Sequence, residues 1–380
     1  MATDQSRIRS LDLLRGLTIS AMILINNPGS FDFIWPPLAH SEWHGWTFAD
    51  LVFPAFLFLM GVALPVSTKK RMKAGASRGE IFSHGLIRAG LLFMIGLFIN
   101  AFPFGLFSHE FSLGSLRIMG VLQRIAICYL FALVLYLFLS SRTLLAMIPS
   151  ILLGYYLLLR FVPVPGYGAG VLDQEGNLVW YIDSILLSGH TWLFASVEGF
   201  DPEGLLSTFP AVASTLIGVQ VGGWLLSQNS KLEKIALLLV TGVGLIILAE
   251  ILKYVMPINK NLWTSTYVLL SSGWVISLLG ILMWFEFNKM LPRIQFGQAQ
   301  MGRNALALFI LSECLAMLMW SVAWNTDTGK FYTLHDFIYL KLLAPGLGNQ
   351  LGSLAYGLLN LGLLVLVAVW LDQRRIYLKL

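Results

Sequence analysis

Charged residues are scarce in this chain. They make up 12% of its 380 residues, whereas 57% are apolar, and the mean hydropathy is +0.75. A soluble domain typically has about 25% charged and about 45–50% apolar residues. The shortage of charge therefore excludes an ordinary water-soluble domain and predicts a protein that lies in a lipid bilayer.

Cysteines and cofactor motifs are also scarce. The two cysteines, Cys128 and Cys314, lie inside apolar runs, and the chain has no CxxC or Cys/His pattern. The sequence therefore predicts no metal site. It also has no P-loop, no GxGxxG followed by a helix and no clear internal repeat, so neither a nucleotide-binding motif nor a repeat fold is indicated.

The chain carries a net charge of +5 and has an isoelectric point near 9.1. In a soluble protein this excess would suggest a nucleic-acid partner. Here the basic residues cluster in short connections between apolar runs, which is typical of topology signals in membrane proteins. We therefore expect no nucleic-acid partner.

Long apolar runs dominate the sequence. A run of about 17–25 residues can cross a bilayer as a helix, and we find about ten. The sequence predicts an all-α polytopic membrane bundle of about ten transmembrane helices in a single domain, residues 1–380. The first run lacks a small-residue cleavage motif, which favours a retained helix over a signal peptide. The runs lie near residues 11–28, 48–67, 84–102, 116–139, 143–161, 204–226, 232–255, 263–285, 301–322 and 351–370.

Basic residues flank alternate apolar runs and predict the orientation of the chain. If the runs alternate across the bilayer, these cations share one side, which the positive-inside rule assigns to the cytoplasm together with both termini. The other side then holds the connection 26–50 and a long acidic loop, 162–203, of a length that is uncommon and often functional. The basic residues are Arg7, Arg9, Lys69, Lys70, Arg71, Lys73, Arg78, Arg142, Lys231, Lys234, Lys289, Arg293, Arg374, Arg375 and Lys379.

The most informative segment is residues 22–53, where a cluster of polar residues lies between two apolar runs. Ionisable side chains at a membrane boundary are costly, so they suggest function. The polar residues are Asn26, Asn27, His40, Glu42, His44 and Asp50.

His40 is the leading catalytic candidate in this segment. A histidine with a near-neutral pKa acts as a general base or as an acyl-accepting nucleophile. Alternatively, it is an interfacial histidine bonded to backbone. Asp50 either stabilises the start of the next helix or orients His40. His44 is the weaker rival.

Arg124 lies well inside the fourth apolar run, where an arginine needs a cavity, a partner or a ligand. Glu313 in the ninth run is one possible partner, and an anionic ligand is the alternative that we favour. Gln123 beside it would add hydrogen bonds to such a ligand.

Three further groups have both a structural and a functional interpretation. Asn259, Lys260 and Asn261 either bind a sugar or phosphate, or form a polar turn before the interface anchor Trp263. Asn304 opens the ninth run, where asparagine is often a helix cap. The cationic stretch 69–73 is a topology signal that would also attract a phosphorylated cytosolic cofactor.

Several segments in order along the chain resemble the heparan-α-glucosaminide N-acetyltransferase family of polytopic membrane enzymes. They are RIRSLDLLRGLTI, ILINNPGS, LAHSEWHGWTFADLVFPAFLFLMG, LRIMGVLQRIAICY, YIDSILL, FDPEGLLST, IGVQVG, PINKNLWTSTYV and MGRNAL. The chain departs from the family pattern at Ser312-Glu313, where we associate His-Glu with the family, and at His44, where lysosomal members have asparagine.

The resemblance implies a reaction and a set of site residues. Such enzymes take acetyl from cytosolic acetyl-CoA and deliver it to a terminal glucosamine amine across the membrane, and the family suggests a homodimer. The chain is similar to a bacterial-type member of the inner membrane, with its outer loops in the periplasm. The resemblance implies His40, Asp50 and Asn26 as catalytic, Arg124, Gln123, Lys69, Lys70 and Asn304 as donor-binding, and Asn259, Lys260, Trp263, Asp201 and Glu203 as substrate-binding residues.

Two other functions stay open at this point. A sugar or lipid-linked glycan transporter would line its path with polar residues inside the spans, although paired helix breaks are not evident. A scaffold without chemistry would leave His40, Asp50 and Arg124 without a role. Acyl transfer through histidine accounts for these residues best.

Overall fold

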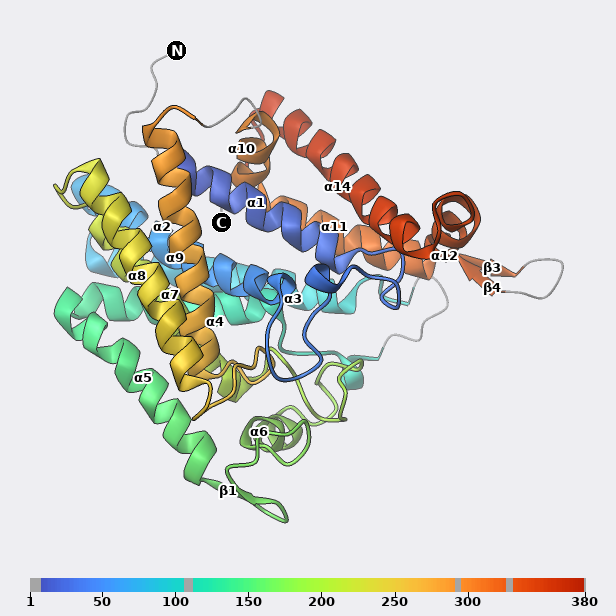
Figure 1. Ribbon diagram of the computed structural model, residues 1–380, viewed down its shortest axis with the longest axis horizontal. Helices are drawn as coiled ribbons and strands as arrows, with labels where there is room; N and C mark the ends of the chain where they lie inside the picture. Colours follow the sequence, from blue (N-terminus) through green and yellow to red (C-terminus); the bar gives the residue numbers. More distant parts are fainter. Residues whose placement is uncertain (1–7, 106–111, 291–294, 326–330, 379–380) are drawn as a thin grey trace.

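A computed structural model of the chain describes residues 8–105, 112–290, 295–325 and 331–378. Helices make up most of the structure, and the only strands among these residues form two short antiparallel hairpins (Figure 1). The predicted all-α class is therefore confirmed. The main helices are α1 (Arg9–Asn26), α2 (Val52–Lys73), α3 (Arg78–Ala101), α4 (Val121–Phe138), α5 (Ser141–Phe161), α6 (Leu178–Leu186), α7 (Leu205–Leu225), α8 (Lys231–Leu252), α9 (Ser265–Phe287), α10 (Gln295–Arg303), α11 (Ala305–Ser321) and α14 (Asn349–Gln373).

Shorter elements connect these helices. The 3-10 turns are η1 (Pro36–Leu38), η2 (Phe48–Leu51) and η3 (Leu113–Ser115). The hairpins pair β1 (Pro163–Val164) with β2 (Gly168–Ala169), and β3 (Ala323–Asn325) with β4 (Phe331–Thr333). Between β4 and α14 lie α12 (Leu334–Asp336), the π-helical η4 (Phe337–Leu343) and α13 (Ala344–Leu347).

All ten predicted apolar runs coincide with helices of the structure. Within the described residues, eight helices are long and apolar enough to cross a membrane, or nine spans result if the bent pair α10–α11 counts as one. The first run forms α1, which carries Arg9, Asp12 and Arg15 and is not among the eight. The number of about ten spans and the cytoplasmic side of the termini stay predictions.

The ninth run is not one continuous helix from 301 to 322, as the sequence predicted. Its helices α10 and α11 meet at Asn304 with a bend of 89°. Gly16 of α1 and Gly302 of α10 allow the two backbones to touch, because a Cβ at either position would collide with the other helix. This close crossing packs α10 against α1. The axis of α10 therefore differs from that of α11.

The fourth run also begins later than predicted, at Val121 instead of residue 116. Residues 116–120 are extended because other segments occupy their backbone groups. Asn100 donates to the carbonyls of Arg117 and Met119, at 2.9 and 3.2 Å, and the amide of Ile118 donates to the His190 carbonyl at 3.0 Å. Arg117 therefore lies in a connection outside the helix.

The connections that carry the candidate residues gather at one end of the bundle. Figure 1 shows α6 and β1 near the C-terminal end of α5. Trp43 donates from Nε1 to the Leu172 carbonyl at 2.8 Å, and the amide of Gly45 donates to the Ile258 carbonyl at 2.8 Å. Segment 162–203, predicted as a long loop, therefore contains a hairpin and a helix and packs on connection 26–50.

Candidate active site

His40 and Asp50 form the centre of the candidate site. His40 follows η1 and Asp50 lies in η2, so two short turns bring together side chains that are ten positions apart. Nδ1 of His40 lies 2.7 Å from Oδ1 of Asp50. The carboxylate is fully buried, whereas the imidazole is 45% exposed. A carboxylate in this position accepts a hydrogen bond from Nδ1–H, which leaves the Nε2 lone pair free for chemistry.

The second oxygen of Asp50 is fixed by the backbone. Oδ2 accepts from the amide of Ser41 at 3.1 Å and from that of Thr47 at 2.9 Å. Thr47 and Asp50 form a capping box at the start of η2. The Tyr267 hydroxyl donates to the Asp50 carbonyl at 2.5 Å. The Asp50 side chain therefore both caps the helix and contacts His40.

A lysine joins this pair from a distant part of the sequence. Lys260 lies between α8 and α9, and its Nζ is 3.1 Å from Nδ1 and 3.4 Å from Nε2 of His40. The same Nζ is 3.5 Å from Oδ1 of Asp50, and the lysine side chain is 16% exposed. The structure therefore brings Lys260, expected to bind substrate, into contact with the two predicted catalytic residues.

The surroundings of His40 favour its neutral form. Burial by neighbouring atoms lowers the pKa of His40 from its ordinary value of 6.5, and the charge of Lys260 lowers it further. Asp50 and Glu203 raise the same pKa without cancelling the decrease. At neutral pH the imidazole is therefore mainly uncharged, which is the form that acts as a base or nucleophile.

Asn259 and Trp263 fasten the turn that carries Lys260. Asn259 is fully buried, donates to the Trp43 carbonyl at 2.9 Å and accepts from the Leu262 amide at 2.8 Å. Trp263 is 1% exposed, and its backbone has a left-handed φ of +51°. Both side chains contact protein on all sides here, and their expected contact with substrate stays a prediction.

A second charged cluster lies within electrostatic reach of the first. Arg117 donates to both oxygens of Asp201, at 2.8 and 2.6 Å, and to Glu203 at 2.5 Å. Burial works against the arginine charge, but the two carboxylates raise the pKa of Arg117 overall. Arg117 and its neighbours in turn keep the pKa of Glu203 low despite burial. Asp201 and Glu203, which the resemblance implies as substrate-binding residues, are thus paired with an arginine inside the protein, and their contact with substrate stays a prediction.

Arg124 is fully buried and ties α4 to α7. Its Nη2 donates to the Gly204 carbonyl at 3.3 Å and to the Ser207 hydroxyl, and its guanidinium lies 4.8 Å from the Trp263 ring centre. Among the described residues it forms no ion pair with Glu313, and its Nε and Nη1 lack a hydrogen-bond partner. Binding of an anionic ligand by Arg124 stays a prediction.

Asn26, which the resemblance implies as a catalytic residue, contacts a different helix. At the end of α1 it donates from Nδ2 to Oε1 of Glu313 in α11 at 3.3 Å. The neighbouring Asn27 donates to the Ser312 hydroxyl at 3.1 Å. Among the described residues, Asn26 forms no hydrogen bond with His40. A catalytic role for Asn26 therefore stays a prediction.

The other predicted donor-binding residues are not brought together. Gln123 and Asn304 are 1% exposed, the first against Gly96 and the second at the bend before α11. Lys69 and Lys70 are exposed near the end of α2. At 1.5 Å per residue, this places them about 28 Å from Asp50 along the helix.

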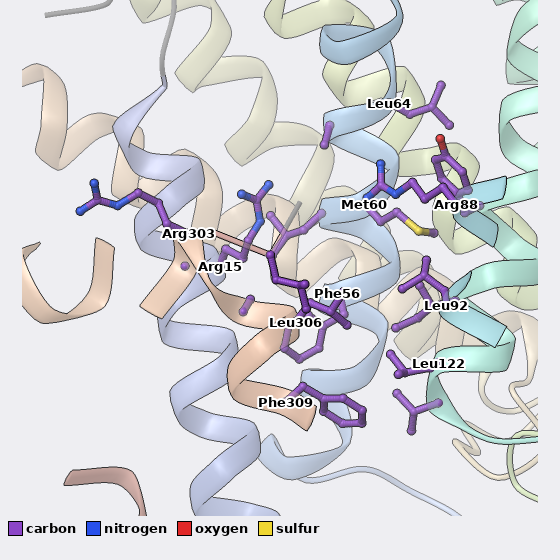
Figure 2. Close-up of a pocket in the computed structure, with 18 of the residues that line it drawn as sticks. Arg15, Phe56, Met60, Leu64, Arg88, Leu92, Leu122, Arg303, Leu306 and Phe309 are labelled. Atoms are coloured by element: carbon purple, nitrogen blue, oxygen red, sulfur yellow. The ribbon is translucent and has the colours of Figure 1, made fainter. Parts of the chain in front are cut away.

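A cavity that the sequence did not reveal lies on the side of these lysines. Its volume is about 350 Å³, and its lining includes Arg15, Arg88, Met22 and Phe309. Figure 2 shows the guanidinium groups of Arg15 and Arg88 toward one end and Phe309 toward the other. Both arginines lie in predicted spans, so the rule that singled out Arg124 would have found them too.

The fold and this site define a polytopic helical membrane protein with a histidine–aspartate–lysine centre. Residues 7–242 match the family model described as heparan-alpha-glucosaminide N-acetyltransferase, catalytic. The heparan-alpha-glucosaminide N-acetyltransferase of Homo sapiens is 30% identical over 73% of this chain and 48% of its own length. That of Mus musculus is 29% identical over 74% of this chain and 49% of its own length. The chain belongs to the heparan-alpha-glucosaminide N-acetyltransferase family.

The matches confirm the resemblance inferred from the sequence motifs. The chain spans about half the length of the curated relatives that it matches. His40 and Asp50 lie inside the segment matched by the family model, whereas Lys260 lies beyond its end at residue 242.

Proposed function

We propose that this protein is a transmembrane N-acetyltransferase that moves acetyl from acetyl-CoA to the amine of an amino sugar, such as a terminal glucosamine. Family membership supports the reaction class. The observation that carries the proposal is the 2.7 Å contact between Nδ1 of His40 and Oδ1 of the buried Asp50. Acyl transfer needs such an imidazole, neutral and held in one tautomer.

The 350 Å³ cavity supports entry of the donor from the side with the basic connections. Arg15 and Arg88 suit the donor phosphates, because charge-assisted hydrogen bonds to phosphate are strong. The opposite, apolar end includes Met22, one helical turn from Asn26 on α1. Arg15 and Asn26 are separated by about 16 Å along α1, a distance that the thioester arm would span.

A second cavity extends the basic region. It has a volume of about 300 Å³ and shares Ser67, Arg88 and Tyr129 with the first. Arg71 and His84 also line it, and Nη2 of Arg71 lies 3.1 Å from Nε2 of His84. We assign the phosphates of acetyl-CoA to this basic region in place of the exposed Lys69 and Lys70.

Two routes fit the geometry of the His40 site. In one, Nε2 accepts the acetyl group and passes it to the sugar amine. In the other, Nε2 removes a proton from the amine while the amine attacks the thioester directly. In both, Asp50 holds the tautomer and stabilises the imidazolium.

We further propose that the protein lies in a bacterial inner membrane, with the His40 site on the periplasmic side. The distribution of basic residues supports this orientation. A homodimer is proposed on the family resemblance alone.

The test is acetyl transfer from labelled acetyl-CoA by the purified full chain, with and without glucosamine. We expect the wild type to label glucosamine and His40→Ala to lose at least about 100-fold in rate, which is the lower end of what a positioned acid–base group contributes. His44→Ala is the matched control, since His44 lies in the same connection and bonds Asn259 at 3.2 Å.

The outcomes separate the alternatives. Label trapped on the wild-type protein without glucosamine favours the acetyl-histidine route, and its absence favours direct transfer. Equal rates for wild type and His40→Ala contradict the proposed site. If acetyl-CoA does not bind to the wild type, a sugar or glycan transporter becomes the better proposal.

A further inference from the structure

We propose that Lys260 is a catalytic residue: its ammonium group stabilises the oxyanion that forms when the acetyl thioester reacts at His40. This inference rests on the proposed function of His40. It assigns Lys260 to the reacting carbonyl, in place of the sugar or phosphate contact that the sequence suggested.

The position of Nζ beside both ring nitrogens supports this role. Nζ lies 3.1 Å from Nδ1 and 3.4 Å from Nε2 of His40. The lone-pair directions of the two ring nitrogens diverge, so one ammonium cannot bond both, and Nδ1 already faces Asp50 at 2.7 Å. The amino group of Lys260 therefore lies beside the imidazole ring, within 3.4 Å of the reactive Nε2.

A carbonyl carbon bonded to Nε2 would hold its oxygen close to Nζ. The carbon is one bond from Nε2 and the oxygen is one bond further, whereas Nζ is 3.4 Å from the same nitrogen. A donor fixed where negative charge develops is the arrangement that lowers the barrier of acyl transfer.

Within the described residues, the side chains that contact the His40 ring nitrogens are Asp50 and Lys260. Lys260 is the hydrogen-bond donor of this pair. Asn26 donates to Glu313 instead, at 3.3 Å. Lys260 is therefore the donor that the structure places at His40.

The turn before α9 holds Lys260 in place, and two carboxylates lie near its amino group. Burial lowers the pKa of Lys260, but the carboxylates of Asp50 and Glu203 oppose this decrease. The Trp263 amide donates to the Lys260 carbonyl at 3.0 Å, within the turn that Asn259 fastens. The amino group of Lys260 is thus positioned before the substrate arrives.

The step balances as follows in the acetyl-histidine route. The Nε2 lone pair of His40 forms a bond to the thioester carbon, and the carbonyl electron pair moves to oxygen beside Lys260. Return of that pair breaks the carbon–sulfur bond, and the thiolate of CoA leaves with the electrons. The Nδ1 proton stays with Nδ1 beside Asp50. The amine then takes the acetyl group and releases one proton, which balances the proton taken up by the thiolate.

The test compares Lys260→Met with Lys260→Arg in labelled acetyl transfer by the full chain. We expect Lys260→Met to lower kcat by about 100- to 1,000-fold, as for loss of one oxyanion donor, with unchanged binding of acetyl-CoA. Lys260→Arg, which keeps the charge, should retain more activity. Lys253→Met is the control, because Lys253 is 41% exposed and pairs with Glu250 at the same end of the bundle.

Two further readouts separate this role from a structural one. Lys260→Cys in a Cys314→Ser background, treated with bromoethylamine, regains a side-chain ammonium and should regain activity; the remaining Cys128 is fully buried. The acidic limb of the pH profile, below 6.5 in the wild type, should move to higher pH in Lys260→Met, because Lys260 lowers the pKa of His40.

Each outcome decides the inference. Unchanged kcat in Lys260→Met overturns it while leaving the proposed function intact. Loss of acetyl-CoA binding together with failure of aminoethylation to restore transfer also overturns it, in favour of a structural role. If the wild type transfers no acetyl group, the proposed function and this inference both fail.

Discussion

Asp50 uses its two oxygen atoms for two different purposes. Oδ2 accepts from the backbone amides of Ser41 and Thr47, and Oδ1 faces the His40 ring. A carboxylate held by backbone donors has little freedom to rotate. The helix cap and the catalytic partner, which were alternatives at the level of the sequence, are therefore compatible in one residue.

The sequence predicted the pairing of His40 with Asp50 but not the contact of Lys260 with His40. The first two residues are ten positions apart, and local turns are enough to join them. Lys260 is 220 positions from His40, so its contact depends on how the turn before α9 packs on connection 26–50. No local pattern encodes a contact of that kind, although the family motif had marked the lysine as functional.

Asp183 in α6 predicts a dependence of stability on pH. It is fully buried, and Oδ1 accepts from the Leu205 amide at 2.9 Å. Burial, with help from Asp201, raises its pKa from 3.8 to about 7. The folded state thus binds this proton more tightly than the unfolded state. Its contribution is complete below 3.8 and is lost as the pH rises through about 7.

We therefore expect Asp183→Asn to raise Tm by a few degrees above pH 7 and to change it little in acid. Asparagine keeps the acceptor for the Leu205 amide but carries no charge to bury. The measurement is thermal unfolding in detergent across this pH range, with the exposed Asp173→Asn as the control. A rise of equal size at every pH would show that the charge of Asp183 is not the cause.

At the scale of elements, glycine determines how closely the central helices approach. A Cβ on Gly61 of α2 would collide with the Thr215 carbonyl of α7, and one on Gly218 of α7 would collide with the Phe58 carbonyl of α2. Such contacts between backbones hold membrane helices together by close packing. The α2–α7 pair also supports the site, because α2 continues directly from η2 and Asp50.

We expect Gly218→Val to destabilise the protein by about 1–3 kcal/mol, or to prevent folding, because the added side chain overpacks the interface. Gly223→Val in the same helix is the matched control, since a Cβ there meets nothing within 4 Å. Thermal unfolding and monodispersity in detergent measure the difference. Equal loss in both variants would point to valine in the helix rather than to the α2–α7 contact.

Helix positions followed from the apolar runs, whereas breaks between helices did not. The runs near 204–226 and 263–285 correspond closely to α7 and α9. The bend between α10 and α11 depends on Gly16 of α1, far away in the sequence, and hydropathy alone does not register it. The extended residues 116–120 likewise depend on donors and acceptors from other segments.

At the scale of the whole molecule, the two functional regions lie at opposite ends of the bundle. His40, Asp50 and Lys260 gather where connection 26–50 meets the turn before α9, whereas the basic cavities are lined by Arg71 and Arg88. This separation suits an enzyme that takes its two substrates from opposite sides of a membrane. The pattern of cations predicts an orientation, which stays a prediction. The cavities could not be predicted from the sequence, because they arise where several helices leave space between them.

The basic cavities lead to a prediction about donor specificity. Arg88 lines both of them, and its guanidinium lies 4.7 Å from the Tyr129 ring centre. Its Nε is buried and has no hydrogen-bond partner among the described residues. If this group contacts a donor phosphate, Arg88→Gln removes a charge-assisted hydrogen bond of about 1.5–3 kcal/mol.

We therefore expect Arg88→Gln to raise KM for acetyl-CoA by about tenfold or more, since 1.4 kcal/mol corresponds to a factor of ten. The value of kcat should change little, because Arg88 is far from His40. S-acetylpantetheine, which lacks the nucleotide phosphates, should react equally well with both proteins. Arg142→Gln is the control, an exposed cation on the same predicted side that lines neither cavity. An equal loss with both donors would mean that Arg88 supports the fold of the cavity and does not recognise phosphate.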